Sequence, residues 1–72
     1  MTGPQWGWPN LTRGERFVAE LVAEGMTNRQ VAERLCLSPH TVDFHLRQVF
    51  RKLDITNRVN LTRIVVEHTL VA

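Results

Sequence analysis

The apolar positions between residues 37 and 53 recur at steps of three and four, which is the spacing of one face of an α-helix. The recurring apolar residues are Val42, Leu46, Val49, Phe50 and Leu53. The opposite side of the same helix carries His40, Asp43, Phe44, Arg47 and Arg51. The pattern predicts a helix over residues 39–53 with a buried back and an exposed front that is basic in its C-terminal half.

A strong start signal precedes this helix. Ser38 can accept a hydrogen bond from a backbone N–H of the first turn. Pro39 suits the first helical position, because its missing N–H costs nothing there. Leu37 and Val42 have the spacing of a hydrophobic staple, which fixes how the chain enters a helix.

Two shorter helices are expected upstream. Each opens with a capping box, in which a Thr and a Glu or Gln three residues later satisfy each other's backbone N–H: Thr12 with Glu15, and Thr27 with Gln30. Gly25 suits the left-handed residue that closes the first helix. The expected spans and inward-facing residues are 13–24 with Phe17, Val18, Leu21 and Val22, and 28–35 with Val31, Ala32 and Leu35.

Only residues 36–38 separate the second helix from the third. So short a link between amphipathic helices forces a steep crossing, as in helix-turn-helix units. Cys36 lies between two leucines, so we expect it to behave as a small buried hydrophobic residue. A single cysteine excludes an internal disulfide and a cysteine-rich metal site.

A fourth helix is expected over residues 57–69, with Thr56 as its N-cap. Its core-facing residues would be Leu61, Ile64, Val65 and His68. A second, partly apolar face consists of Val59, Thr62 and Val66. Little of so short a chain remains to cover that face, which suggests self-association, although a slightly apolar exposed face is the alternative. Four helices without an alternating strand pattern predict an all-α fold.

Residues 1–10 contain two Gly and two Pro and no periodicity, so we expect an irregular arm followed by one helical domain over residues 11–72. Trp6 and Trp8 are unexpected in such an arm. They could fold back onto the domain, cover a partner, or lead out of an upstream domain.

The 72 residues suffice for one small domain with a modest core. The net charge is +2, and the excess lies in residues 40–72, where four Arg and one Lys face three acidic residues. This positive excess favours a polyanionic partner, although a solvated helix face can carry the same excess of charge. No apolar run approaches the length of a membrane helix, and no secretory signal pattern opens the chain, so we expect a cytoplasmic protein without membrane contact.

Four spaced motifs run along the chain: Leu11-Thr12-x-x-Glu15-Arg16, Gly25-Met26-Thr27-Asn28-Arg29-Gln30-Val31-Ala32-x-x-Leu35, Leu37-Ser38-x-x-Thr41-Val42-x-x-His45 and Lys52-Leu53-x-Ile55-x-Asn57-Arg58. In this register they resemble the LuxR-type (GerE-type) helix-turn-helix domain.

The resemblance implies a four-helix bacterial transcription-factor domain that acts at the nucleoid. Its third helix would enter the major groove of double-stranded DNA, and its fourth would pair two copies on an inverted repeat. It implies no cofactor, and it admits RNA polymerase as a further partner. In that family the domain usually follows a sensory part, and stand-alone members of about this size also exist.

The resemblance also assigns roles to single positions. Residues at base-contacting positions are Asp43, Phe44 and Arg47, which the helix pattern extends to His40. Residues at phosphate- or backbone-contacting positions are Thr27, Asn28, Thr41 and Lys52, which the helix pattern extends to Arg51. His45 matches a histidine at the edge of the core, and the dimer contacts would be Val59, Thr62 and Val66.

The sequence departs from the family pattern at a few positions. Asp43 stands where Lys is common, and a carboxylate there can accept a hydrogen bond from a cytosine amino group or pair with Arg47 one turn on. Gly14 replaces a usual Arg, which removes one positive charge. Asn60 and Thr62 are more polar than the small apolar residues often found there, which disfavours a tight dimer.

Three other functions are alternatives to DNA binding by a LuxR-type domain. An enzyme is disfavoured, because His40 and His45 lie on different sides of their helix and no metalloprotease motif, phosphate loop or nucleophile elbow occurs. A helical protein-interaction module with weak or lost DNA binding is favoured by Asp43 and the low net charge. A sigma-factor-like promoter-reading domain is disfavoured by the fourth helix after residue 58.

Overall fold

The computed structural model describes the backbone of residues 8–71 and the side chains of residues 8–68. The described part consists of helices alone: a 3₁₀ turn η1 (Trp8–Asn10), then α1 (Arg13–Ala23), α2 (Asn28–Leu35), α3 (Pro39–Leu53) and α4 (Arg58–Val71). The all-α fold is therefore confirmed. The bounds of α2 and α3 agree with the sequence prediction, α1 ends one residue earlier, and α4 begins one residue later and extends to residue 71.

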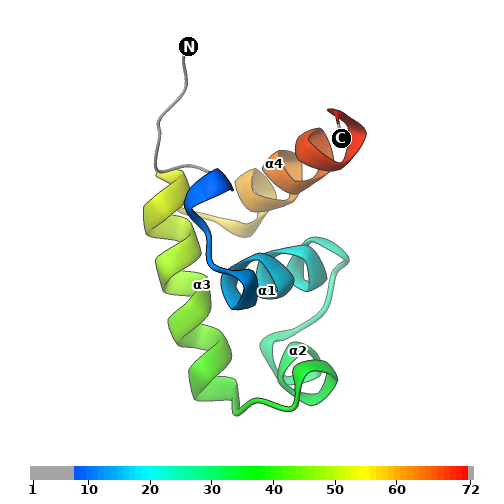
Figure 1. Ribbon diagram of the computed structural model, residues 1–72. Helices are drawn as coiled ribbons and strands as arrows, with labels where there is room; N and C mark the ends of the chain where they lie inside the picture. The colour runs from blue at the N-terminus through cyan, green and yellow to red at the C-terminus, as the bar shows by residue number, and fades with distance from the viewer. Residues whose placement is uncertain (1–7, 72) are drawn as a thin grey trace.

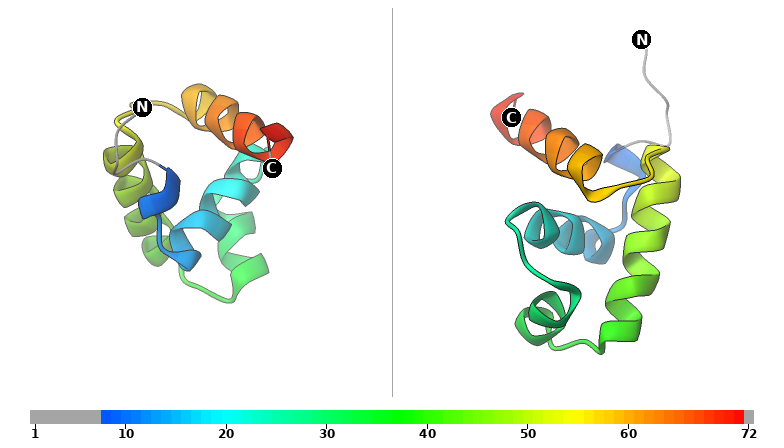
Figure 2. Two further views of the ribbon diagram at one scale, coloured as in Figure 1. Left: turned by 45° about the horizontal axis from the view of Figure 1, so that its top comes forward. Right: turned by 180° about the vertical axis from the view of Figure 1, so that it is seen from behind.

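The long helix α3 forms one side of the molecule, and the three other helices stack beside it (Figure 1). Helix α2 lies at the N-terminal end of α3, α1 crosses its middle and α4 lies near its C-terminal end, as the view from behind also shows (Figure 2). Helix α1 packs against both α3 and α4, so it is the centre of the fold. The largest fully buried side chains come from all four helices: Val18, Val31, Val42, Val49 and Leu61.

The local signals for helix starts are mostly confirmed. Thr12 and Glu15 form the full capping box of α1, and Thr27 and Gln30 form that of α2. The Ser38 hydroxyl accepts from the backbone N–H of Thr41 at 3.1 Å and so caps α3.

One cap was misplaced by a residue. Thr56 was expected to cap the fourth helix, but α4 begins at Arg58 and the Asn57 Oδ1 atom accepts from the backbone N–H of Asn60 at 2.9 Å. Asn57 is therefore the N-cap, and it belongs to the same preferred set of capping residues.

The burial predictions for Phe17 and Cys36 are wrong. The Phe17 side chain is 47% exposed, whereas Ala19 is fully buried, so the inward face of α1 includes Ala19 in place of Phe17. Cys36 is exposed, because it ends α2 in the left-handed conformation with φ 58° and this turn carries its side chain outward.

Trp8 settles one of the questions about the N-terminal arm. Its ring stacks on that of His68 with centroids 5.0 Å apart, and it packs against the core, so this tryptophan folds back onto the domain. His68 was expected to face the core, but its side chain is exposed and lies under Trp8 instead. The expectation for Trp6 falls outside the described residues.

Candidate nucleic-acid interface

The two faces of α3 divide as the sequence predicted. Val42, Leu46, Val49 and Leu53 are buried on its back, and Phe50 is partly buried. Burying a side chain such as Val49 stabilises a fold by about 1.5–3 kcal/mol, so four of them hold this helix firmly. His40, Phe44, Arg47 and Arg51 are exposed on the front. The outer face of α3 is therefore free to meet a partner while its back is fixed.

Phe44 is the most unusual residue on this face. Its side chain is 58% exposed, and its ring forms an edge-type contact with the ring of the neighbouring His45, at a centroid distance of 6.0 Å. Exposure of a phenyl ring to water is unfavourable, and an apolar partner group outside the domain, such as a thymine methyl group, could cover it.

Asp43 and Arg47 form an ion pair on the flank of this face. The Arg47 Nε atom lies 3.0 Å from the Asp43 Oδ2 atom, one helical turn away. The pairing that the sequence left open is thus present in the free domain. This contact is made through Nε, and the outer nitrogen atoms of the guanidinium carry four further N–H donors.

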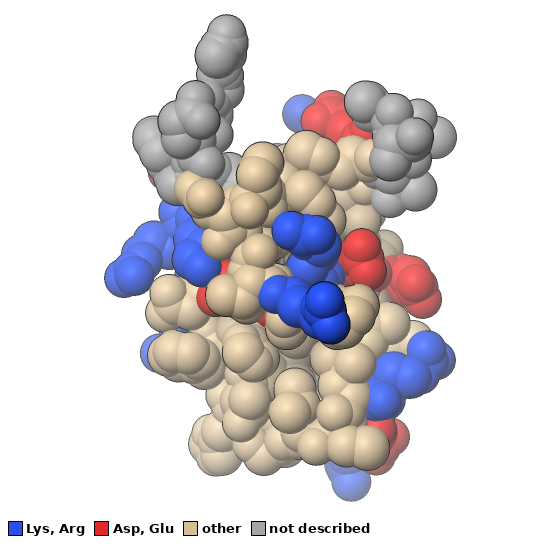
Figure 3. All heavy atoms as spheres, viewed as in Figure 1, with Lys and Arg blue, Asp and Glu red and all other residues tan. Residues whose placement is uncertain are grey.

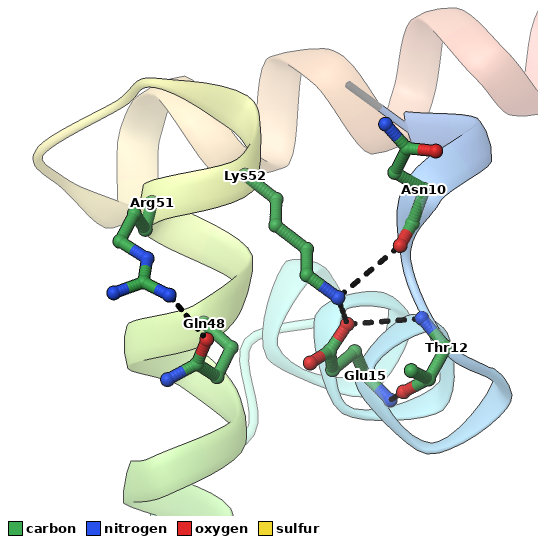
Figure 4. Close-up of polar contacts among 6 residues, drawn as sticks. All are labelled: Asn10, Thr12, Glu15, Gln48, Arg51 and Lys52. Carbon is green, nitrogen blue, oxygen red and sulfur yellow. Dashed lines mark hydrogen bonds and ion pairs between the residues drawn. The ribbon is translucent and has the colours of Figure 1, made fainter. Parts of the chain in front are cut away.

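Lys52 occupies a different environment from the one expected for a phosphate contact. Its ammonium group donates to Glu15 Oε1 at 2.8 Å and to the backbone oxygen of Asn10 at 3.2 Å (Figure 4). It thereby ties the C-terminal turn of α3 to the start of α1. Two of its three N–H donors are used, so Lys52 can offer a phosphate one donor at most.

Glu15 lies at the centre of this cluster and was missed as a site residue. Its side chain is 7% exposed, and it accepts from the backbone N–H of Thr12 as well as from Lys52. Burial disfavours the charged form and raises the pKa, but the hydrogen bonds from Lys52 and Thr12 and the charge of Lys52 outweigh it, so the pKa of Glu15 is lowered. The capping box in the sequence identified the contact with Thr12, but no local signal pointed to Lys52, which lies 37 residues away.

Arg51 lies next to Lys52 but points elsewhere. It donates to Gln48 Oε1 at a long 3.4 Å, so its guanidinium is only weakly held and remains on the exposed face (Figure 4). Positive side chains gather over the C-terminal half of α3 and over α1, whereas the N-terminal half of α3 is largely uncharged on the face seen in Figure 3.

The start of α2 brings the other expected phosphate contacts together. Thr27 is exposed and Asn28 is half-buried at the first turn of this helix. Arg58 reaches them from α4: it donates to Asn28 Oδ1 at 2.7 Å and to the backbone oxygen of Met26 at 3.3 Å. Thr41, on the first turn of α3, is half-buried and its hydroxyl lies 3.0 Å from that of Ser38.

His45 lies half-buried between α3 and α1, as the family position implied. Its ring packs beside Gly14: a Cβ atom on that glycine would lie 3.6 Å from His45 Cε1, which is an ordinary van der Waals contact. The Nδ1 atom of His45 is buried, with no hydrogen-bond partner among the described residues.

The outer side of α4 carries the expected self-association residues. Val59 is 74% exposed and Val66 is 46% exposed, while Thr62 is half-buried between them. In the described part of the chain, no cluster of three acidic, His or Cys side chains could hold a metal ion. No helix there has the length and apolar character needed to cross a membrane.

Comparison with known proteins supports the family resemblance. Residues 9–65 match the family described as bacterial regulatory proteins, luxR family. The HTH-type transcriptional regulator Mb0914c of Mycobacterium bovis is 48% identical over 58 residues, which are 81% of this chain and 7% of that protein. AlkS of Alcanivorax borkumensis, another HTH-type transcriptional regulator, is 50% identical over 49 residues, which cover 68% of this chain and 6% of AlkS. The transcriptional regulatory protein UhpA of Escherichia coli is 45% identical over 53 residues, which cover 74% of this chain and 27% of UhpA.

The chain thus spans only about 7% of the length of the first of these relatives. The residues of this chain that match the family include α1, α2, α3 and the first half of α4, which are the elements that carry the candidate interface. On the strength of this match, the chain belongs to the luxR family of bacterial regulatory proteins.

Proposed function

We propose that this domain binds double-stranded DNA in a sequence-specific manner, as part of a bacterial transcriptional regulator. One observation carries the proposal: α3 is anchored by a largely buried back and presents His40, Phe44, Arg47 and Arg51 on its exposed face. A helix of this kind fits the major groove, where side chains can reach base edges. The regulator names of the relatives support the same function.

Base contacts would come from the exposed face of α3. Arg47 would donate through its outer nitrogen atoms to the O6 and N7 atoms of a guanine, while Asp43 holds its Nε atom. Asp43, one helical turn before Arg47, would accept a hydrogen bond from a neighbouring cytosine amino group. Phe44 would contact a thymine methyl group, and His40 would contact a base near the start of the helix.

Phosphate contacts would set the register of the domain on DNA. Thr27 and Asn28 at the start of α2, Thr41 at the start of α3 and Arg51 near its end flank the base-contacting residues. We expect Lys52 to contribute less to phosphate binding than Arg51, because two of the three N–H donors of Lys52 bind Glu15 and Asn10.

Two copies would pair through α4. Val59, Thr62 and Val66 form an outward strip that a second copy could cover. Two α3 helices about 34 Å apart would then read an inverted repeat, and a bacterial regulator on such a site would act on RNA polymerase. Each copy has few free positive charges on α3, so pairing would supply much of the affinity.

The proposal is tested by measuring binding to a site selected from a random DNA pool and to a random duplex, each at two salt concentrations. We expect Arg47→Ala to weaken binding to the selected site by about tenfold or more, and to leave binding to the random duplex nearly unchanged. Arg51→Ala should weaken both alike and flatten the salt dependence. Arg63→Ala, which removes the same charge from the exposed side of α4, is the control.

Absence of retardation of either duplex at low salt would reject DNA binding. The ion pair between Asp43 and Arg47 would then favour the alternative function, a helical protein-interaction module, because it neutralises the central positive charge of the exposed face.

A further inference from the structure

Arg58 connects two helices that the sequence did not link. It is the first residue of α4, yet its guanidinium lies at the start of α2. The Nη2 atom donates to Asn28 Oδ1 at 2.7 Å, and the Nη1 atom donates to the backbone oxygen of Met26 at 3.3 Å. The sequence motif contained Arg58, but no role was attached to it.

The contact decides which way the Asn28 side chain faces. A side-chain amide has an acceptor end and a donor end, and either can be turned toward a neighbour. A guanidinium has only donors, so it accepts only the oxygen end as a partner. The Oδ1 atom of Asn28 therefore faces Arg58, and the NH₂ group is directed away from Arg58. No other described residue forms a hydrogen bond with that NH₂ group.

The direction matters because phosphate oxygens are acceptors. An amide that presented its oxygen to a phosphate would repel it, whereas one that presents its NH₂ group donates a hydrogen bond. The second hydrogen bond of Arg58, to Met26, fixes the guanidinium on the loop before α2. The amide is thus oriented by a group that is itself held in place.

We propose that Arg58 is a positioning residue for DNA binding, which holds the Asn28 amide with its NH₂ group outward so that it donates to a phosphate oxygen. This inference rests on the proposed function. Arg58 acts through Asn28 and not by a contact of its own with DNA. Its effect on affinity should therefore depend on the presence of the Asn28 amide.

A double-mutant cycle tests this dependence. The variants are Asn28→Ala, Arg58→Met and the combination, and the probe is a fluorescent random-sequence duplex of about 20 base pairs at low salt, since phosphate contacts do not depend on sequence. We expect each single substitution to weaken binding by about three- to tenfold, and the double variant to be little weaker than either single one. Arg63→Met, which removes an equal charge from α4, should change binding much less.

Asn28→Asp tests whether the outward group of residue 28 lies against a phosphate, and it leaves Arg58 in place. The carboxylate can still accept from Arg58, but its second oxygen replaces the NH₂ group. It should therefore bind the duplex more weakly than Asn28→Ala does. This comparison tests the phosphate contact of residue 28 even where Arg58→Met reduces stability, which circular dichroism and thermal unfolding of each variant will show.

The outcomes separate the two ideas. A wild-type domain that fails to bind any duplex removes the proposed function and the inference with it. Wild-type binding to the duplex, combined with additive losses from Asn28→Ala and Arg58→Met, overturns only the inference, because Arg58 would then act independently. Binding by Asn28→Asp that equals or exceeds that of Asn28→Ala overturns it as well.

Discussion

Glu15 is the one charged residue that is buried among the described side chains, and its surroundings explain why. A carboxylate in a core is costly unless it is paired and hydrogen-bonded. Here Lys52 supplies the charge, and Thr12 supplies a backbone N–H. The result is a cross-link between the start of α1 and the end of α3, so a single side chain helps to set the tilt of the helix that bears the interface.

The pKa of Glu15 predicts how stability depends on pH. Because burial is outweighed by the contacts with Lys52 and Thr12, the pKa is lower in the folded state than in the unfolded chain. The unfolded state therefore binds a proton more readily. The stabilisation is complete above the ordinary pKa of 4.5 and is lost as pH falls through the lower folded value.

Urea unfolding of the wild type and Glu15→Gln between about pH 7 and about pH 3 measures this effect. We expect Glu15→Gln to lower the unfolding free energy by about 1–3 kcal/mol at neutral pH. On acidification, the unfolding free energy of Glu15→Gln should fall less than that of the wild type. Glu24→Gln, at the exposed end of α1, removes the same charge and should keep the wild-type acid dependence. Equal acid dependence in wild type and Glu15→Gln would refute the role of this carboxylate.

At the scale of the helix, α3 shows how the pattern of one element can be read. Its periodicity predicted the buried and exposed sides well, because a long helix samples both faces several times. The capping signals at Ser38 and Pro39 fixed its first residue. The pattern did not decide whether Asp43 pairs with Arg47. The distance of 3.0 Å between Asp43 Oδ2 and Arg47 Nε in the structure shows that it does.

The ion pair on α3 predicts a gain in binding when it is removed. Asp43→Asn should strengthen binding to a random duplex by several-fold, because it removes a negative charge from the exposed face and frees Arg47. Stability should change by less than about 0.5 kcal/mol, because such exposed pairs contribute little.

Glu33→Gln is the matched control for this measurement. It removes an equal charge from the other exposed pair one helical turn apart, Arg29 with Glu33 at 4.0 Å on α2. A similar gain from both substitutions would show a general charge effect, and no gain from Asp43→Asn would remove Asp43 from the interface.

At the scale of the whole molecule, the sequence predicted elements better than the contacts between them. Caps and stripes are local, so the four helices and most of the core could be inferred. The links from Lys52 to Glu15 and from Arg58 to Asn28 join residues 37 and 30 positions apart, and no local pattern reports them. The outward turn of Cys36 could not be predicted either, because residues other than glycine rarely adopt the left-handed conformation that Cys36 has here.

The proposed assembly is tested by its solution mass. Val59→Asp places a charge at a side chain that is 74% exposed, so the fold should be unaffected while pairing through α4 is weakened. Sedimentation equilibrium should shift toward the monomer, and binding to a selected inverted repeat should fall by about tenfold or more, because avidity is lost.

Phe17→Asp is the control, because Phe17 is an exposed apolar residue on α1, outside the outward strip of α4. An unchanged mass for Val59→Asp, or a wild type that is monomeric on its DNA site, would show that α4 does not pair two copies.

The stack of Trp8 on His68 has a practical consequence for attachments to this domain. Because this stack holds Trp8 against α4, a reporter protein fused directly to Trp8 would lie at the end of the molecule that α4 forms. The opposite end of the molecule, where the chain connects α2 to α3, would not be covered by such a fusion (Figure 1). A fluorophore coupled to the exposed Cys36 thiol would stand at that opposite end, so the two labels would report on different ends of the same molecule.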